Sequence, residues 1–134
     1  MILRIEHLGI AVNDMENANK LFSALLGVPN YKTETVESEK VSTSFFKVGE
    51  SKVELLKATD PESSIAKFIA KKGEGIHHVA FEVDDIHSMM TELRSQGFQL
   101  LSDEPKKGAD NKLICFLHPK STNGVLVELC QEIR

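Results

Sequence analysis

Two histidines and two glutamates recur at matching places in this 134-residue chain, and together they could bind a divalent metal. His7 and His78 each lie in an alternating strand pattern, where their side chains share a face with small residues. Glu54 and Glu128 lie in two apolar segments. In a strand, each glutamate side chain points to the face opposite to that of its bulky apolar neighbours. Imidazole nitrogens and carboxylate oxygens, with positions left for water, suit a catalytic metal. The sequence therefore predicts a single metal site with His7, Glu54, His78 and Glu128 as ligands.

The elements that must position these four residues form an internal repeat. HLGIAVND at 7–14 is matched 71 positions later by HVAFEVDD at 78–85. VELL at 53–56 is matched by VELC at 127–130. An amphipathic helix pattern follows each opening segment, with an aspartate suited to cap its first turn and a glycine placed to end it. A repeat with a matched start, helix and finish indicates a duplicated module.

Each half is predicted to run from a strand through a helix to two or three further strands. We expect a single domain, 1–134, with module one over about 1–58 and module two over about 75–134. Asp60 and Pro61 predict the start of a connecting helix over about 60–72. The later strands are expected near residues 32–36, 41–48, 52–57, 98–102, 113–118 and 124–131.

The three remaining histidines have other expected roles. His77 points to the opposite face of its strand from His78, so we expect it to be structural. His87 and His118 have no partner in the repeat, and we expect them at the surface and in a turn. The metal site is therefore predicted without them.

The composition is that of an ordinary soluble globular protein, with 41% hydrophobic and 27% charged residues. A formal net charge of −4 argues against binding to nucleic acid or to an anionic membrane, since both require a basic surface. No run approaches the ~18 apolar residues of a membrane span, and Met1 opens no signal-peptide pattern. Cys115 and Cys130 form no CxxC pair and lie among apolar neighbours, so we expect them to be buried and reduced in a cytoplasmic protein.

The duplicated module with ligands at equivalent positions resembles the vicinal oxygen chelate superfamily, which includes glyoxalase I, extradiol dioxygenases and fosfomycin-resistance proteins. Within it, the chain is similar to the methylmalonyl-CoA epimerase family over nearly its full length. The segments that carry this similarity are IEHLGIAV, KVELL, DPESSIAKFIAKKGEGIHHVAFEVDDI and GFQLLSDEPKKGADNKLICFLHPKSTNGVLVEL. The resemblance implies an α+β fold, the glyoxalase fold, in which two tandem βαβββ modules form a curved mixed sheet around a central metal-binding cleft.

The same resemblance assigns the metal ligands to His7, Glu54 (where the family has Glu or Gln), His78 and Glu128. It implies a metal-dependent epimerase that interconverts the 2R and 2S forms of methylmalonyl-CoA, by proton transfer at C2 through a metal-stabilised enolate. Glu128 is the expected catalytic residue. The implied cofactor is one divalent ion among Co, Mn, Ni, Mg and Zn. The implied partners are an acyl-CoA substrate and a second copy of the chain in a homodimer.

The second proton-transfer group is left open by the sequence. Thr43 stands where some members of the family have an acid–base glutamate, and Glu37-Ser38-Glu39-Lys40 replaces the family's Pro-Glu-Gln-Gly. Glu37, Glu39 and a metal-bound water are the alternatives.

Lysines 106, 107 and 120 are positions that could meet the phosphates of CoA.

Three other functions are weighed against epimerisation. A glyoxalase I-type isomerase (lactoylglutathione lyase) would use the same metal and proton chemistry. However, the loop DEPKKGA at 103–109 and the turn HPK at 118–120 resemble the epimerases. An extradiol dioxygenase would place two histidines and one glutamate on Fe(II), whereas this chain offers four ligands. A non-catalytic binding protein of the same fold needs no metal, whereas all four ligand positions are retained here.

Overall fold

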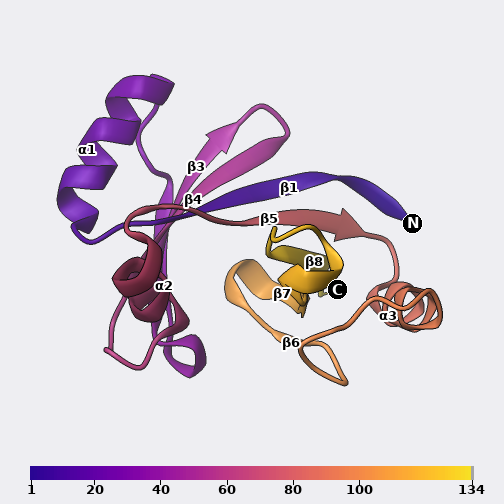
Figure 1. Cartoon of the computed structure of the whole chain (residues 1–134). Coiled ribbons are helices and arrows are strands. Elements are labelled where there is room, and N and C mark those ends of the chain that lie inside the picture. Colours follow the sequence, from indigo (N-terminus) through magenta and orange to yellow (C-terminus); the bar gives the residue numbers. More distant parts are fainter. Residues whose placement is uncertain (134) are drawn as a thin grey trace. The chain divides into compact units, whose positions relative to one another are not determined.

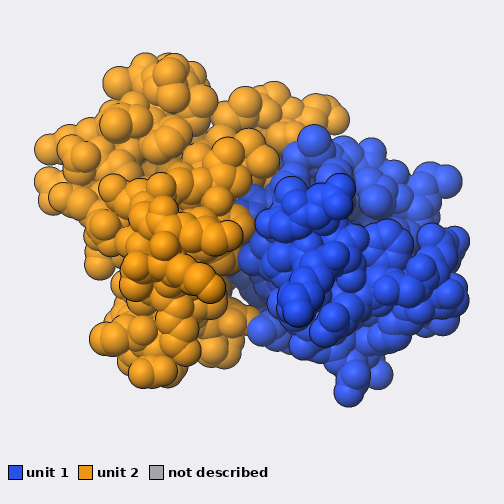
Figure 2. Space-filling view, in the orientation of Figure 1, with its two compact units in different colours: residues 1–6, 78–134 blue, residues 7–77 orange. Residues whose placement is uncertain are grey.

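The computed structural model describes residues 1–133, which form two compact units. One unit is residues 7–77, and the other joins residues 1–6 to the described residues from His78 onward (Figure 2). Strands β1 (Ile2–Ala11) and β5 (Gly75–Val83) each contribute residues to both units. None of the helices in residues 1–133 is long and apolar enough to cross a membrane.

The unit of residues 7–77 contains a mixed sheet and two helices (Figure 1). After β1, its elements are α1 (Met15–Leu26), β2 (Lys32–Val36), the 3₁₀ turn η1 (Glu37–Glu39), β3 (Val41–Val48), β4 (Ser51–Ala58) and α2 (Ser64–Lys72). The strand order is β2-β3-β4-β1, with β1 parallel to β4 and the other neighbours antiparallel. The strands predicted near 32–36, 41–48 and 52–57 are confirmed.

Helix α1 begins and ends where its capping residues predict. Asp14 is the N-cap, and its carboxylate accepts a hydrogen bond from the backbone N–H of Asn17 at 3.0 Å. Gly27 is the C-cap, with a φ of 75° in the left-handed region that favours glycine. The apolar side of the helix packs against Phe46 and Leu55, both fully buried. The bulky face of the sheet is thus the helix-covered face, as the alternation predicts.

Helix α2 starts later than the sequence predicts. Asp60 does not cap it; its carboxylate accepts from the N–H of Glu62 at 2.7 Å, and its carbonyl accepts from the N–H of Ser63 at 3.0 Å. These bonds make residues 60–63 a turn, because an aspartate side chain that closes a local turn competes with helix formation. The helix N-cap is Ser63, whose hydroxyl accepts from the N–H of Ile65 at 3.1 Å. The predicted start at Asp60 is therefore wrong by about one turn.

The other unit repeats the same order of elements. After β5 come α3 (Ile86–Ser95), β6 (Lys106–Lys107), the turn η2 (Ala109–Asn111), β7 (Lys112–Leu117), the turn η3 (Pro119–Ser121) and β8 (Val127–Glu132). The strand order is β5-β8-β7-β6, with β5 parallel to β8 and the others antiparallel. The start of β1 also belongs here, and the guanidinium of Arg4 donates to the carboxylate of Glu82 at 3.0 Å. The prediction of two βαβββ modules is confirmed.

Helix α3 packs on the face of this sheet that is opposite to the histidine and glutamate side chains. Its N-cap is Asp85, which accepts from the backbone N–H of Ser88 at 3.2 Å. Ile86 and Met90 of the helix are almost fully buried, and they form a core cluster with Leu129 of β8. The core of each module therefore lies between its helix and the bulky face of its sheet.

The strand predicted near residues 98–102 is absent. In that segment, Leu100 makes an isolated bridge with Leu117, and the edge strand is the two-residue β6 further along the chain. The guanidinium of Arg94 donates to the carbonyls of Ser102 and Asp103 at 2.9 and 2.8 Å. The backbone of the segment makes two hydrogen bonds beside the bridge, from the N–H of Leu101 to the carbonyl of Phe116 at 2.9 Å and from the N–H of His118 to the carbonyl of Gln99 at 2.8 Å. The polar segment 105–111 contains β6 and η2 instead.

Candidate metal and active site

His7 and Glu54 form a buried pair in the unit of residues 7–77. Glu54 of β4 is the register partner of Gly9 of β1, so His7 lies two residues away on the same face of the sheet. His7 Nδ1 lies 3.1 Å from Glu54 Oε2, and each side chain is only 6% exposed.

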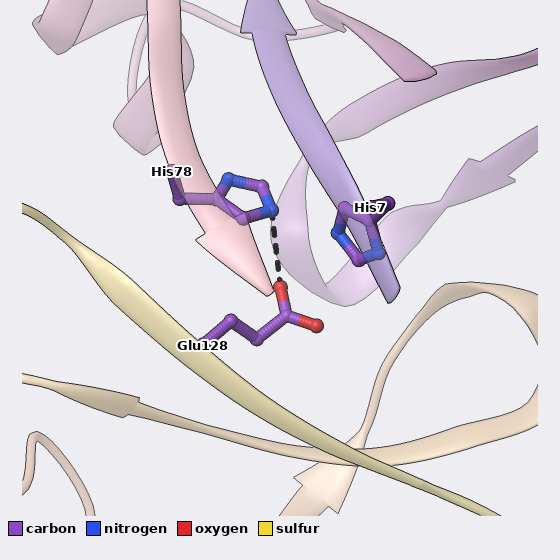
Figure 3. Close-up of side chains that lie close together, drawn as sticks. All are labelled: His7, His78 and Glu128. Atoms are coloured by element: carbon purple, nitrogen blue, oxygen red, sulfur yellow. Dashed lines mark ion pairs between the residues drawn. The ribbon is translucent and has the colours of Figure 1, made fainter. Parts of the chain in front are cut away.

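His78 and Glu128 form the matching pair in the other unit. Glu128 of β8 is the register partner of Ala80 of β5, and His78 again lies two residues before that partner. His78 Nε2 lies 3.2 Å from Glu128 Oε1, and the side chains are 5% and 7% exposed. Figure 3 shows this ion pair as a dashed line between β5 and β8, and it also draws His7.

The two pairs have the same register on the same kind of strand pair. In each unit two parallel strands are neighbours, and the glutamate faces the residue two places after the histidine. Each pair belongs to a group of His and Glu residues whose possible ligand atoms lie within 4.8 Å of one another. A carboxylate and an imidazole so deeply buried are tolerated when they bind each other or a cation. The donor set therefore fits a divalent metal.

Two phenylalanines line these pairs, and the sequence analysis missed them. Phe45 of β3 is the register partner of Glu54, and Phe116 of β7 is the register partner of Glu128. Phe45 is fully buried, and the Phe116 ring meets the His78 ring edge-on, with centroids 5.7 Å apart. Their spacing of 71 residues equals the spacing of the two histidines, so the repeat itself contained the signal. Each ring lies on the same side of the sheet as its glutamate, because register partners on neighbouring strands point to the same face.

The remaining histidines lie where the sequence predicts. His77 packs edge-on against Phe68 of α2, with ring centroids 5.0 Å apart. His87 is exposed on α3, and His118 is the N-cap of the turn η3. These three residues therefore have structural or surface positions.

Both cysteines are free and buried, as predicted. Burial raises the pKa of the Cys115 thiol to about 11, and the Glu128 carboxylate adds to this effect. Burial, and next the Glu128 carboxylate, also raise the pKa of the Cys130 thiol. Neither thiol is a ready thiolate ligand or nucleophile at neutral pH.

The structure does not bring Glu37 or Glu39 to the His7–Glu54 pair. Both lie in η1, beyond the last register pair of the β2–β3 hairpin. Glu54 is opposite Phe45, four residues or about 14 Å along β3 from that end of the hairpin. Thr43 lies on β3 with only 1% of its surface exposed.

The fold is that of a known class of protein. Residues 6–116 match the family model of the Glyoxalase/Bleomycin resistance protein/Dioxygenase superfamily, and the chain belongs to this family.

Within the superfamily, the resemblance to methylmalonyl-CoA epimerases is confirmed. The chain is 40% identical over 133 residues to an ethylmalonyl-CoA/methylmalonyl-CoA epimerase of Cereibacter sphaeroides, covering 98% of this chain and 99% of that protein. It is 40% identical over 129 residues to the mitochondrial methylmalonyl-CoA epimerase of Homo sapiens, covering 96% of this chain and 73% of that protein. A variant of the Streptomyces coelicolor methylmalonyl-CoA epimerase, solved with 2-nitronate-propionyl-CoA, matches at a TM-score of 0.95 and 35% identity, covering 100% of both chains. These relatives are isomerases.

Proposed function

We propose that the chain is an epimerase that interconverts the 2R and 2S forms of methylmalonyl-CoA. The observation that carries the proposal is the pair of buried His–Glu couples with identical register in the two modules. Membership of the glyoxalase superfamily and the 40% identity to an ethylmalonyl-CoA/methylmalonyl-CoA epimerase support the choice of reaction. The substrate class follows from the relatives, one of which is solved with an acyl-CoA analogue.

We further propose that His7, Glu54, His78 and Glu128 bind one divalent cation. The donor set of two imidazoles and two carboxylates supports this, since Co, Mn, Ni, Mg and Zn all accept nitrogen and oxygen donors. When bound, such a cation supplies Lewis-acid stabilisation of the charge that develops on the thioester oxygen. Metal analysis of the purified protein by mass spectrometry checks this step. A His78→Ala variant that retains the same metal content would contradict the proposed ligand set.

The reaction requires that the proton on C2, which lies between a thioester carbonyl and a carboxylate, is removed from one face and returned to the other. We propose that Glu128 transfers the proton on one face. Its position beside Phe116 supports this role, because a carboxylate shielded from bulk water is a stronger base towards carbon. His78, 3.2 Å away, holds the carboxylate in place.

Proton NMR in D₂O tests the proposed function directly. Incubation of 2R-methylmalonyl-CoA with the protein should remove the C2 proton signal and convert the substrate into a mixture of both epimers, with no other product. Unchanged C2 signal and unchanged stereochemistry, in protein that contains stoichiometric metal, would refute the proposal. A parallel incubation with the hemithioacetal of methylglyoxal and glutathione tests the glyoxalase alternative.

For the CoA moiety we propose Lys106, Lys107 and Lys120 as phosphate contacts, which their exposed positions on β6 and η3 support. Reversing these charges one at a time should raise KM for the CoA ester and leave KM for a truncated pantetheine thioester unchanged. Equal effects on both substrates would argue against phosphate binding.

We also propose a cytoplasmic homodimer. Two free, buried cysteines are typical of a reducing compartment. Exposed apolar side chains at the start of β1, namely Ile2, Leu3 and Ile5, each about half exposed, support association with a second copy. Light scattering after size exclusion should give twice the chain mass, and an Ile5→Lys substitution should weaken the association. A monomeric mass would refute the homodimer.

A further inference from the structure

Two lysines lie directly opposite each other beside the His7–Glu54 pair. Lys52 of β4 is the register partner of His7 on β1, and Lys47 of β3 is the register partner of Lys52. His7 and the two lysines therefore form one row across three strands of the unit of residues 7–77. Register partners on neighbouring strands point to the same side of a sheet, so both lysines share the face of His7.

Lys52 is the nearer of the two lysines to the proposed metal ligands. It lies two residues before Glu54 on β4, and one strand spacing of about 4.8 Å separates its backbone from that of His7. Lys47 lies one strand further, at about 10 Å from the His7 backbone. Lys52 is half-buried, whereas Lys47 is exposed. The flexible stem of Lys52 therefore brings an ammonium group within reach of the space beside His7 and Glu54.

The two lysines concentrate positive charge on this part of the sheet. Like charges directly opposite on neighbouring strands destabilise a sheet, and a bound anion offsets that repulsion. Glu54, in the adjacent row, is engaged with His7 at 3.1 Å. Glu34, one row further, lies 3.8 Å from a third lysine, Lys32. The row of the lysine pair itself contains no carboxylate, so its charge favours an anionic ligand.

The substrate proposed for this chain offers two kinds of anion, namely the free carboxylate of its acyl group and the phosphates of CoA. The carboxylate is bonded directly to C2, the carbon at which the proton is transferred. The phosphates lie at the far end of the long pantetheine arm. Because Lys52 is the direct neighbour of His7, its position fits the carboxylate better than a phosphate.

We propose that Lys52 binds the free carboxylate of the acyl group and that Lys47 adds a second positive charge behind it, an inference that rests on the proposed function. Removal of the C2 proton adds a negative charge to an acyl group that already carries one. An ammonium group beside the carboxylate lowers the energy of this doubly charged species. It also favours malonyl-type esters over acyl-CoA esters that lack a carboxylate. Lys52 is therefore a specificity-determining residue.

Isothermal titration calorimetry of the metal-containing protein with two CoA esters tests this assignment without turnover. Malonyl-CoA and propionyl-CoA have the same chain length and the same CoA moiety, and they differ in the carboxylate. Lys52→Gln should weaken the binding of malonyl-CoA by ~10–100-fold, in the range for loss of a hydrogen bond between charged groups, and leave that of propionyl-CoA unchanged. Lys52→Arg keeps the charge and should retain most of the affinity. Lys57→Gln, on the same strand but the opposite face, is the matched control and should bind both esters normally.

The outcomes separate the carboxylate from the other possible ligands. Equal loss of affinity for both esters in Lys52→Gln would assign the lysine to a CoA phosphate and overturn the proposal. Unchanged affinity for both esters would overturn the subsite itself.

The second lysine provides an independent readout. Lys47→Gln should raise the urea midpoint of the ligand-free protein, because it removes the like-charge pair, and should weaken malonyl-CoA binding by a smaller factor than Lys52→Gln. A lower midpoint would contradict the charge argument.

Failure of the proposed function is distinguishable from failure of this subsite. An unsubstituted protein that binds malonyl-CoA but does not exchange the C2 proton of methylmalonyl-CoA would overturn the epimerase proposal alone. An unsubstituted protein that binds neither ester would overturn both.

Discussion

Replacing Glu128 by glutamine should damage turnover far more than replacing Glu54 by glutamine. The two glutamates are matched in their surroundings. Their carboxylates lie 3.2 and 3.1 Å from a histidine nitrogen, and their side chains are 7% and 6% exposed. Each faces a phenylalanine on the neighbouring antiparallel strand. The structural cost of the substitution should therefore be similar at the two sites, so a difference in rate reports chemistry.

The expected difference follows from the role proposed for each residue. Glutamine keeps an oxygen for the metal at both positions, and the family resemblance allows Glu or Gln at position 54. At position 128 the amide cannot accept and return a proton near neutral pH. We therefore expect Glu128→Gln to lose ~10²–10⁴-fold in rate, equivalent to about 3–5 kcal/mol in the activation barrier. Glu54→Gln should lose less than tenfold.

The assay is loss of the C2 proton signal in D₂O, measured with the metal content and the urea midpoint of each variant. Similar metal content and similar midpoints establish that the two sites were perturbed equally. Equal mild losses of rate would refute the reasoning, because Glu128 would then be only a ligand. A loss of rate that is proportional to the loss of bound metal would also refute the reasoning.

Three predictions concern stability and the thiols. Lys40 has a left-handed backbone with a φ of 55°, so Lys40→Gly should raise the free energy of unfolding by about 0.5–1 kcal/mol in urea titrations, and a decrease would contradict the strain argument. Hydrogen bonds from Ser88 lower the pKa of Asp85 in the folded protein below its ordinary value near 4. The Asp85 carboxylate therefore stabilises the folded state at a pH above that ordinary pKa, and this stabilisation is lost as the pH falls through the lower pKa of the folded state. Asp85→Asn should therefore flatten the fall in stability between pH 5 and about pH 2, and an unchanged pH dependence would exclude this carboxylate as a source. With a pKa of about 11, roughly one in a thousand Cys115 thiols is ionised at pH 8, so a thiol reagent should label it slowly in the native protein and rapidly in urea.

The duplicated pattern was sufficient to predict most of the fold. Strand alternation and helix caps are local properties, so Asp14, Gly27 and Asp85 marked the helix ends correctly. The same patterns failed where two signals competed. Asp60 and Ser63 are both good caps, and the turn bonds made by Asp60 determined that the helix begins after Ser63. In the segment 98–102, where a strand was predicted, the chain makes a single bridge at Leu100, and Arg94 holds the carbonyl of Ser102; no local pattern shows either contact.

For the site, the sequence by itself determined which residue types recur and on which face of each strand they lie, because side chains alternate with a period of two. It could not determine strand register, which depends on how segments far apart in the chain pair with each other. Only the tertiary structure showed that Glu54 faces Gly9 and Glu128 faces Ala80. Register also brings residues nine positions apart in the chain, such as Glu34 and Thr43, to adjacent points of one face.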